Sequence, residues 1–290
     1  MPPIEALVEQ SLAYLASTAA LQALALDPYW PKWDSPWWHM TLLWELGLAR
    51  RLPPAIVEAM TRALATRYLD FMPFTLDQLP PGKDWARDVP CHCALGVMHQ
   101  VLSACGLAVD DEVPWIKPWF LRYQLPDGGL NCEGDAYVGS RKSSVVSTVP
   151  VLEAMLAAER GEAERAFVDR GARYLIAHRL VRSSSGAVID AAWLKPCFPR
   201  FYEYDVLRGA DFLLAWAAKR ATALPAGTLR DAAPWLEDGR PRAVEREALT
   251  TRSLVHADST WSKGESSRFA LLDVVSRPGY QPWSRRIKSK

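Results

Sequence analysis

Five similar helix-forming segments recur along this 290-residue chain. Each begins with a turn-rich or aromatic stretch, continues as an apolar helix and ends near a glycine or a charged cluster. With residues 38, 92, 144, 204 and 267 as reference points, the intervals are 54, 52, 60 and 63 residues. An interval of this length holds an outer helix, a loop and an inner helix. Because stacked hairpins bury each other's apolar faces, the repeat predicts one helical array whose curvature could close into a ring.

The apolar residues within the repeats follow helical spacing. In residues 4–26, leucines recur at steps of three to six with alanines between them, and β-branched runs are scarce along the chain. Gly47, Gly106 and Gly161 follow periodic runs, where we expect helix C-caps. The sequence therefore predicts an all-α fold. The expected inner helices cover residues 40–48, 94–105, 145–158, 206–218 and 269–275.

Composition excludes several classes of protein. Thirty-four basic and 33 acidic residues give a net charge of +1, so no electrostatic argument favours nucleic acid as a partner. The hydrophobic content of 49% excludes a mainly disordered chain. The first residues lack the basic start of a signal peptide, and no apolar stretch is long enough for a transmembrane segment. Five cysteines, an odd number, indicate reduced thiols and a cytoplasmic location, whereas the oligomeric state stays open.

A motif in the third repeat resembles that of a known family. Residues 119–130 are Trp-Phe-Leu-Arg-Tyr-Gln-Leu-Pro-Asp-Gly-Gly-Leu. This string resembles the Gln-and-Trp motif of squalene and hopene cyclases, with Leu130 where the family has an aromatic residue. In such a motif, the Gln124 side chain can tie the end of one outer helix to the start of the next. The Asp-Gly-Gly turn needs a positive φ, which glycine adopts without strain.

The resemblance implies the superfamily of terpenoid cyclases and protein prenyltransferases, whose fold is an α/α toroid. We expect one toroid of about five helical hairpins over residues 1–280, followed by a basic tail, 281–290. Inner helices of such toroids line a central cavity, and the active groups cluster at the mouth where the inner helices begin. The expected partner is therefore a small-molecule ligand, apolar and isoprenoid-like.

By this analogy, the residues just before the inner helices are the candidate site. We expect Asp205 to act as the acid or base, with Tyr204 and either His39 or His92 as its partners. The alternative for Asp205 is a helix N-cap, and for each histidine a hydrogen-bonded position at a helix start. The candidate ligand-binding residues are Trp37, Trp38, Asp127, Cys132, Tyr137, Lys142, Tyr202 and Arg268.

Tryptophans gather in one short segment before the first inner helix. Trp30, Trp33, Trp37 and Trp38 lie within nine positions, interrupted by prolines and polar residues. Because one helix face cannot bury all four indoles, we expect some of them to line the mouth.

The triplet Cys91-His92-Cys93 is a candidate zinc motif. Its spacing is tighter than the usual Cys-x2-Cys knuckle, and no second paired knuckle exists. Protein prenyltransferases hold zinc with an Asp, a Cys two positions later and a distant His at the start of an inner helix. His92 could take that last place, but the sequence contains no Asp-x-Cys. We therefore expect small buried thiols, with no metal and no cofactor.

Standard cyclase motifs are missing from the sequence. The Asp-x-Asp-Asp acid of squalene-type cyclases does not occur, and Asp110-Asp111-Glu112 lacks the last Asp of Asp-Asp-x-x-Asp. We expect this acidic trio to cap the helix that begins near Trp115.

Three functions remain, and whether the chain is an enzyme stays open. It binds or transforms an isoprenoid-like ligand, or acts on a glycan as a lyase or hydrolase, or is a non-catalytic toroid that binds a ligand or peptide.

Overall fold

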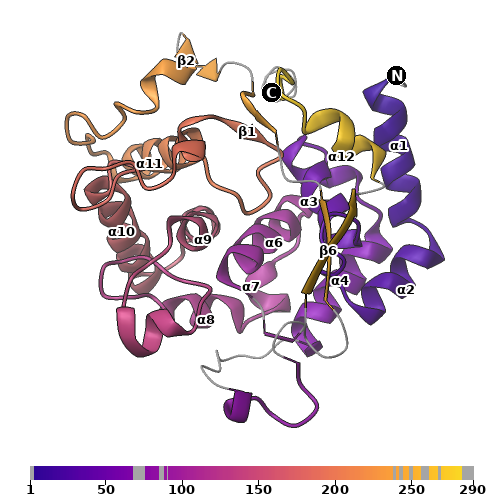
Figure 1. Ribbon diagram of the computed structural model, residues 1–290. Coiled ribbons are helices and arrows are strands. Elements are labelled where there is room, and N and C mark those ends of the chain that lie inside the picture. Colours follow the sequence, from indigo (N-terminus) through magenta and orange to yellow (C-terminus); the bar gives the residue numbers. More distant parts are fainter. Residues whose placement is uncertain are drawn as a thin grey trace.

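The computed structural model of the chain is mainly helical, as the sequence predicts (Figure 1). It describes residues 3–67, 76–84, 88–89, 91–237, 240–241, 244–247, 251–255, 261–266 and 269–282. None of the helices in these ranges combines the length and the apolar character needed to cross a membrane.

Four buried helices lie side by side in chain order across the middle of Figure 1. They are α3 (Pro36–Glu45), α6 (His92–Cys105), α9 (Val145–Ala157) and α11 (Val206–Arg220). Helix α6 contacts both α3 and α9, and α9 contacts α11. These helices correspond to four of the five expected inner helices, and the fifth is α12 (Ala270–Val275).

The remaining helices flank this series. They are α1 (Ile4–Leu15), α2 (Thr18–Leu26), α4 (Pro54–Arg67), α7 (Val109–Glu112), α8 (Ile116–Arg122) and α10 (Glu162–Ala177). Helix α2 packs on α4, and α10 packs on α9. Helix α10 is amphipathic, with Phe167, Gly171 and Leu175 buried at helical spacing on its inner face. Single turns of 3-10 or π-helix are η1 (Ala49–Arg51), η2 (Leu76–Gln78), η3 (Ala136–Ser140), η4 (Ala191–Leu194) and η5 (Ala233–Trp235).

Three local expectations need correction. The segment 4–26 forms two helices, because the Ser17 hydroxyl accepts a hydrogen bond from the Ala20 N–H and starts α2. Gly161 is the N-cap of α10 instead of a C-cap, whereas Gly106 ends α6 with a φ of 99° as expected. The acidic trio forms its own turn, α7, and Asp110 pairs with Lys117 of α8 at 2.6 Å instead of capping that helix.

Short strands, which the sequence pattern does not predict, occur late in the chain. Strand β1 (Cys197–Phe198) pairs in parallel with β4 (Arg246–Glu247). Strands β2 (Leu236–Glu237) and β3 (Arg240–Pro241) are antiparallel, as are β5 (Thr251–Val255) and β6 (Trp261–Ser266). Each of these sheets has only two strands, so the hydrophobic core is formed mainly by the helices.

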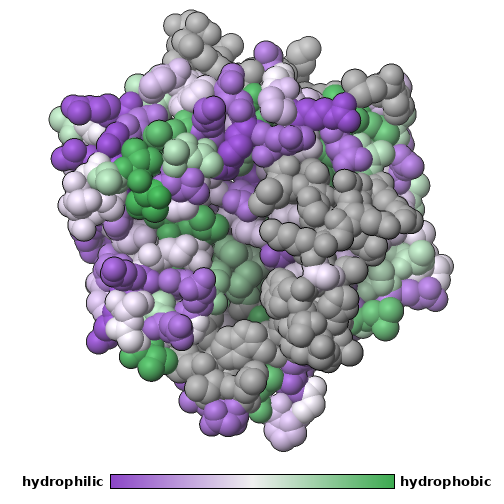
Figure 2. Space-filling view, viewed as in Figure 1, coloured by the Kyte–Doolittle hydropathy of each residue, from purple (hydrophilic) through white to green (hydrophobic). Residues whose placement is uncertain are grey.

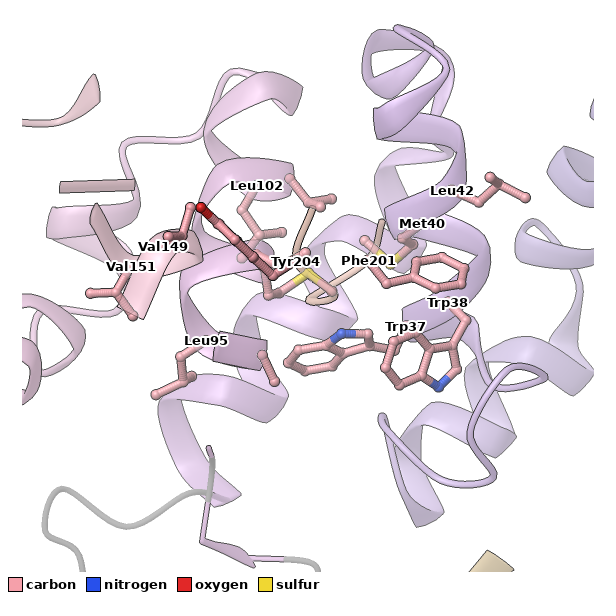
Figure 3. Close-up of a cluster of buried hydrophobic side chains, with 14 of the residues drawn as sticks. Trp37, Trp38, Met40, Leu42, Leu95, Leu102, Val149, Val151, Phe201 and Tyr204 are labelled. Carbon is pink, nitrogen blue, oxygen red and sulfur yellow. The ribbon is translucent and has the colours of Figure 1, made fainter. Parts of the chain in front are cut away.

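The core joins the inner helices to a loop from the second half of the chain. Figure 3 shows Trp37, Trp38 and Met40 of α3 beside Phe201 of the loop before α11, with Leu95 and Leu102 of α6 nearby. On the outer face, Figure 2 shows hydrophilic residues around much of the rim and apolar residues in a recess near the middle.

Helices α6 and α9 make the closest approach between inner helices. A Cβ added at Gly96 of α6 would lie 2.6 Å from the carbonyl carbon of Pro150 in α9. The backbones therefore meet at a distance that only glycine permits. This contact fixes the start of α6 against the start of α9.

The Gln124 side chain connects outer helices as expected from the motif. Its amide donates to the Phe167 carbonyl of α10 at 2.9 Å and to the Gly128 carbonyl at 2.8 Å. Its oxygen accepts a hydrogen bond from Arg170 at 2.8 Å. Gly128 has a φ of 98°, and a Cβ there would lie 2.4 Å from the Arg170 carbonyl oxygen. The motif thus holds the end of α8 against α10.

Candidate metal centre

Three cysteine side chains converge at the N-terminal end of α6. Cys91 precedes the helix, Cys93 lies in its first turn, and Cys132 comes from the loop between α8 and α9. The Sγ atoms of Cys91 and Cys93 are 3.5 Å apart, and those of Cys93 and Cys132 are 3.7 Å apart. All three Sγ atoms lie within 4.8 Å of one another. We call these three residues the thiol cluster.

Hydrogen bonds to α9 hold the loop that carries Cys132. The Leu130 N–H donates to the Thr148 hydroxyl at 2.8 Å, and the Cys132 N–H donates to the Ser147 hydroxyl at 3.1 Å. Both hydroxyls belong to the first turn of α9, and α9 is fixed against α6 at Gly96. The thiol cluster is therefore positioned by two packed helix starts.

The three thiols differ in their electrostatics. Donation from the S–H groups of Cys132 and Cys93, the Ala94 N–H and the positive charge of Lys32 hold the pKa of Cys91 well below its ordinary value. The contacts with Cys132 and Cys91, together with burial, raise the pKa of Cys93 well above its ordinary value. The contact with Cys91 and burial raise the pKa of Cys132 to about 12, although the contact with Cys93 lowers it. Before any metal binds, these shifts favour the thiolate form at Cys91 over Cys93 and Cys132. A helix N-terminus favours such a thiolate.

His92 is buried among aromatic side chains. The Trp119 indole N–H donates to its Nδ1 at 2.9 Å, so the ring proton lies on Nε2 and faces the Tyr137 hydroxyl at 3.1 Å. That hydroxyl donates to the Asn131 carbonyl at 2.9 Å. Burial lowers the pKa of His92 to about 4, so the imidazole is neutral at physiological pH. His92 supports the loop of Cys132 through Tyr137.

A lysine and aromatic rings lie beside the thiol cluster. The Lys32 ammonium donates to the Tyr202 hydroxyl at 3.0 Å, and it lies 5.0 Å from the centre of that ring. It also lies 5.5 Å from the ring centres of Tyr29 and Trp30. Burial, with the nearby thiols, raises the pKa of Tyr29 well above its ordinary value, so its phenol stays neutral. The site therefore combines one positive charge with a thiolate and apolar ring surfaces.

The spacing of the sulfur atoms suits a tetrahedral metal ion. With Zn–S bonds of about 2.3 Å, two sulfurs on a tetrahedron are about 3.8 Å apart. The separations of 3.5 and 3.7 Å are close to that value. Among the described residues, this is the one group of three His, Cys, Asp or Glu whose ligand atoms converge. Within the described part of the chain, the cluster supplies three of the four ligands of a tetrahedral site.

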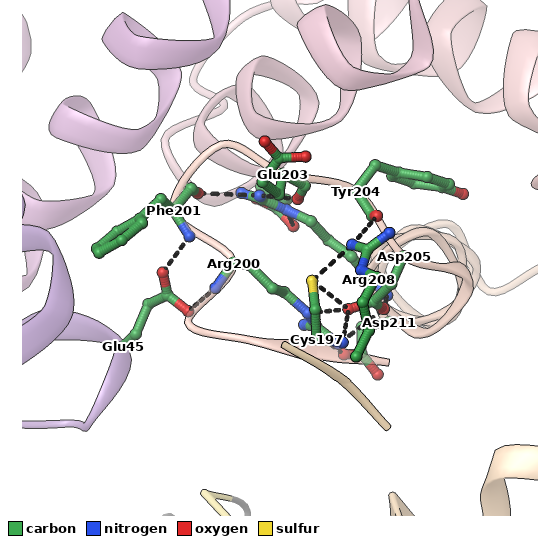
Figure 4. Close-up of polar contacts among 11 residues, drawn as sticks. Glu45, Cys197, Arg200, Phe201, Glu203, Tyr204, Asp205, Arg208 and Asp211 are labelled. Carbon is green, nitrogen blue, oxygen red and sulfur yellow. Dashed lines mark hydrogen bonds and ion pairs between the residues drawn. The ribbon is translucent and has the colours of Figure 1, made fainter. Parts of the chain in front are cut away.

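Two predicted catalytic residues, Asp205 and Tyr204, lie in a buried polar network (Figure 4). Asp205 caps α11 by accepting from the Arg208 N–H at 2.9 Å, and it pairs with the Arg200 guanidinium at 2.9 Å. Burial alone would raise the pKa of Asp205, but Arg200 and the N–H donors lower it below its ordinary value. The Tyr204 hydroxyl donates to the Leu180 carbonyl at 3.0 Å. These contacts match the capping alternative, and the acid or base role stays a prediction.

His39 lies apart from the other predicted catalytic residues. It hydrogen-bonds the Ser11 hydroxyl at 2.7 Å and stacks on Phe269 with 3.5 Å between ring centres. Burial lowers the pKa of His39 to about 3. Its contacts are with α1 and the residue before α12, whereas the thiol cluster lies between α6 and α9.

The predicted ligand-binding residues fall into separate groups. Cys132 belongs to the thiol cluster, Tyr202 lies beside it, and Tyr137 supports the Cys132 loop through its hydrogen bonds to Asn131. Asp127 is a turn residue that accepts from the Ser143 N–H and hydroxyl. Lys142 is exposed at the surface. Arg268 lies outside the described residues.

The expectation that some of the clustered tryptophans line a mouth stays a prediction. Trp30, Trp33, Trp37 and Trp38 are all buried. The loop before α11 provides the partner surface that the sequence does not reveal, because Phe201 stacks on Trp33 at 5.1 Å. Trp38 also donates its indole N–H to the Tyr29 carbonyl.

The sequence analysis missed the joint role of the three cysteines and the role of Lys32. A signal was present, because Cys91-x-Cys93 lies just before one predicted inner helix and Cys132 lies in the loop that precedes the next. Comparison with protein-family models, with curated proteins and with solved structures finds no match to this chain.

Proposed function

We propose that, in contrast to the metal-free thiols expected from the sequence, this protein binds a zinc ion through Cys91, Cys93 and Cys132 and uses a fourth position to bind a small molecule. The observation that supports this most directly is the convergence of three Sγ atoms from two helix starts within 4.8 Å. Thiolates favour zinc and other soft ions over magnesium or calcium. Structural zinc sites have four protein ligands, whereas sites with three protein ligands keep a position for water or substrate.

The surroundings of the thiol cluster indicate the kind of ligand. Three thiolates and one Zn²⁺ carry a net charge of −1, which the Lys32 ammonium offsets. The rings of Tyr29, Trp30 and Tyr202 provide apolar surface around that ammonium. A ligand with a soft donor atom, such as a thiol, and an apolar body fits both features. An isoprenoid-like ligand remains our proposal for the apolar part.

The α/α toroid relationship is likewise a proposal. It is supported by the succession of α3, α6, α9 and α11 and by the outer-helix link through Gln124. In a toroid, the thiol cluster would lie where inner helices begin, which is where the sequence resemblance implies the active groups.

Metal titration of matched variants tests the zinc site. Protein purified with a phosphine reductant and freed of metal is mixed with zinc or cobalt, and bound metal is measured by elemental analysis. We expect about one ion per chain, with a near-ultraviolet sulfur-to-cobalt band and visible bands of tetrahedral cobalt. Cys132→Ser should weaken binding at least tenfold. Cys105→Ser is the control, because Cys105 lies at the far end of α6 and contacts the Ala49 carbonyl.

Failure of the reduced protein to bind a stoichiometric metal ion would overturn the proposal, as would equal binding by the Cys132→Ser variant. The fourth position is tested separately by adding 2-mercaptoethanol to the cobalt protein. A new sulfur ligand should intensify the charge-transfer band, whereas a closed site would give no change.

A further inference from the structure

The sulfur atoms of the thiol cluster lie close enough together to bond covalently after a small movement. The Cys91 and Cys93 sulfurs are 3.5 Å apart, and those of Cys93 and Cys132 are 3.7 Å apart. A disulfide bond is about 2.05 Å long, so two sulfurs must approach each other by about 1.5 Å. Rotation about a Cα–Cβ bond can move a sulfur atom over such a distance while the helices stay in place.

Solvent reaches two of the three cysteines in the cluster. Cys91 and Cys132 are partly exposed, whereas Cys93 is buried. An oxidant as small as hydrogen peroxide can therefore reach a sulfur atom at this site, and cysteine oxidation depends on such access. The cluster thus combines an accessible sulfur with neighbouring sulfurs that can react with it once it is oxidised.

The other two cysteines of the chain have no such neighbours. Cys105 is partly exposed at the far end of α6, and Cys197 is buried beside Asp205. Within the described part of the chain, neither of them contacts another sulfur atom. Exposure therefore does not distinguish Cys105 from Cys91, whereas the presence of nearby sulfurs does.

The chain positions of the three cysteines favour one kind of pairing. A bond between Cys91 and Cys93 would close a small ring over the single residue His92 and constrain the first turn of α6. Cys132 comes from the loop between α8 and α9, so a bond from Cys132 to either of the others forms no such ring. We therefore expect Cys132 to be one of the two partners.

We propose that hydrogen peroxide oxidises the thiol cluster of the metal-free protein to a disulfide that joins Cys132 to Cys91 or Cys93. In the first step, the peroxide transfers one oxygen atom to a thiol, which gives a sulfenic acid and one water molecule. The sulfur of a neighbouring thiol then attacks the sulfenic sulfur, the S–O bond breaks, and a second water leaves. Each sulfur loses one electron, and the two thiol protons leave in the two waters.

This oxidation involves the cysteines of the proposed metal site but does not require that a metal ion ever binds there. A disulfide would remove two of the three sulfur ligands, so the oxidised protein should hold zinc only after reduction. That consequence alone rests on the proposed function.

Mass spectrometry of the native sequence tests the oxidation. Protein reduced with a phosphine and freed of metal is kept with a chelator, treated with an about tenfold excess of hydrogen peroxide, and alkylated with iodoacetamide. We expect two of the five thiols to escape alkylation and to reappear after reduction. Peptide mapping should place the disulfide at Cys132, and Cys105 should remain an alkylated thiol, which makes it a control within the same molecule.

Three results would overturn the proposal: a disulfide confined to Cys91 and Cys93, oxidation to sulfinic acid without a disulfide, or full alkylation of all five thiols. A matched pair of variants provides a second measurement. The yield of disulfide should fall about tenfold or more in Cys132→Ser and stay unchanged in Cys105→Ser. Equal yields in the two variants would contradict the assigned partner.

Failure of this proposal can be distinguished from failure of the proposed function. The metal titration uses reduced protein, whereas the peroxide experiment uses metal-free protein in the presence of a chelator. Absence of a disulfide therefore overturns the oxidation without affecting the metal site, and absence of zinc binding leaves the oxidation standing.

Discussion

At the scale of single residues, the three thiols of the cluster have pKa values shifted in different directions. Cys91 has a pKa well below its ordinary value, whereas the pKa values of Cys93 and Cys132 are raised. Because zinc binds thiolates, Cys93 and Cys132 must lose their protons when the metal binds. We predict release of about two protons per zinc at pH 7.5. Calorimetry in buffers of different ionisation enthalpy measures this number, and release of three protons would contradict the charge on Cys91.

The buried histidines predict a loss of stability in mild acid. The pKa of His39 is about 3 in the folded protein, below its ordinary value of 6.5. The unfolded chain therefore binds more protons, and the free energy of unfolding falls as pH drops below about 6.5. At pH 5, the contribution of His39 is about 2 kcal/mol.

His39→Asn removes this titration and keeps a partner for Ser11. Urea denaturation at pH 7 and pH 5 should show a difference smaller by about 2 kcal/mol than in the native sequence. His92 and His99 also have lowered pKa values and remain in the variant, so part of the acid sensitivity should persist. An unchanged pH dependence would mean that His39 is not buried in its neutral form.

We expect removal of the Asp205 charge to destabilise the fold. Asp205→Asn would leave the mostly buried Arg200 guanidinium without its main carboxylate. We expect the free energy of unfolding to fall by about 3 kcal/mol. Asp231→Asn is the control, because Arg182 and Asp231 form a more exposed pair, which should contribute about 1 kcal/mol or less. Chemical denaturation measures the free energy of unfolding of both variants. Equal losses of stability would contradict the prediction that the buried ion pair of Asp205 contributes more than the exposed one.

At the scale of helices, the approach of α6 to α9 determines where the thiols lie. Gly96→Ala would place a Cβ 2.6 Å from the Pro150 backbone, which must move. We predict a loss of about 2 kcal/mol in stability and weaker zinc binding, since α6 carries Cys91 and Cys93 while the start of α9 holds Cys132. Gly139→Ala is the control, because nothing lies within 4 Å of an added Cβ there. Denaturation and metal titration should change only in Gly96→Ala.

Helices were predictable from the sequence because their signals are local. Alanine and leucine at helical spacing identify α9 and α11, and the Gln124 motif predicts its link between outer helices. The strands and the buried tryptophans were not predictable, because they depend on distant segments. Trp33 packs on Phe201, and β1 pairs with β4. The thiol cluster was missed for the same reason, since Cys132 reaches α6 through a loop held by α9.

At the scale of the whole molecule, the two ends of the described chain meet. Helix α12 packs on α1 (Figure 1), and Phe269 stacks on His39 of α3. Phe269, Leu271, Leu272 and Val275 are all buried. Contacts between α1 and α12 therefore join segments from the two ends of the described chain, and the N-terminal helices depend on residues far away in the sequence.

Removal of the last helix tests this dependence. Each of the four buried apolar side chains contributes about 1.5–3 kcal/mol, so their sum is comparable to the whole stability of a typical domain. We therefore predict that a chain ending at residue 268 does not unfold cooperatively. A chain ending at residue 282 retains every described residue and is the matched control, which should unfold in one transition. Thermal unfolding followed by circular dichroism distinguishes the two. A cooperative transition at the same temperature in both chains would show that the other helices form a stable fold without α12.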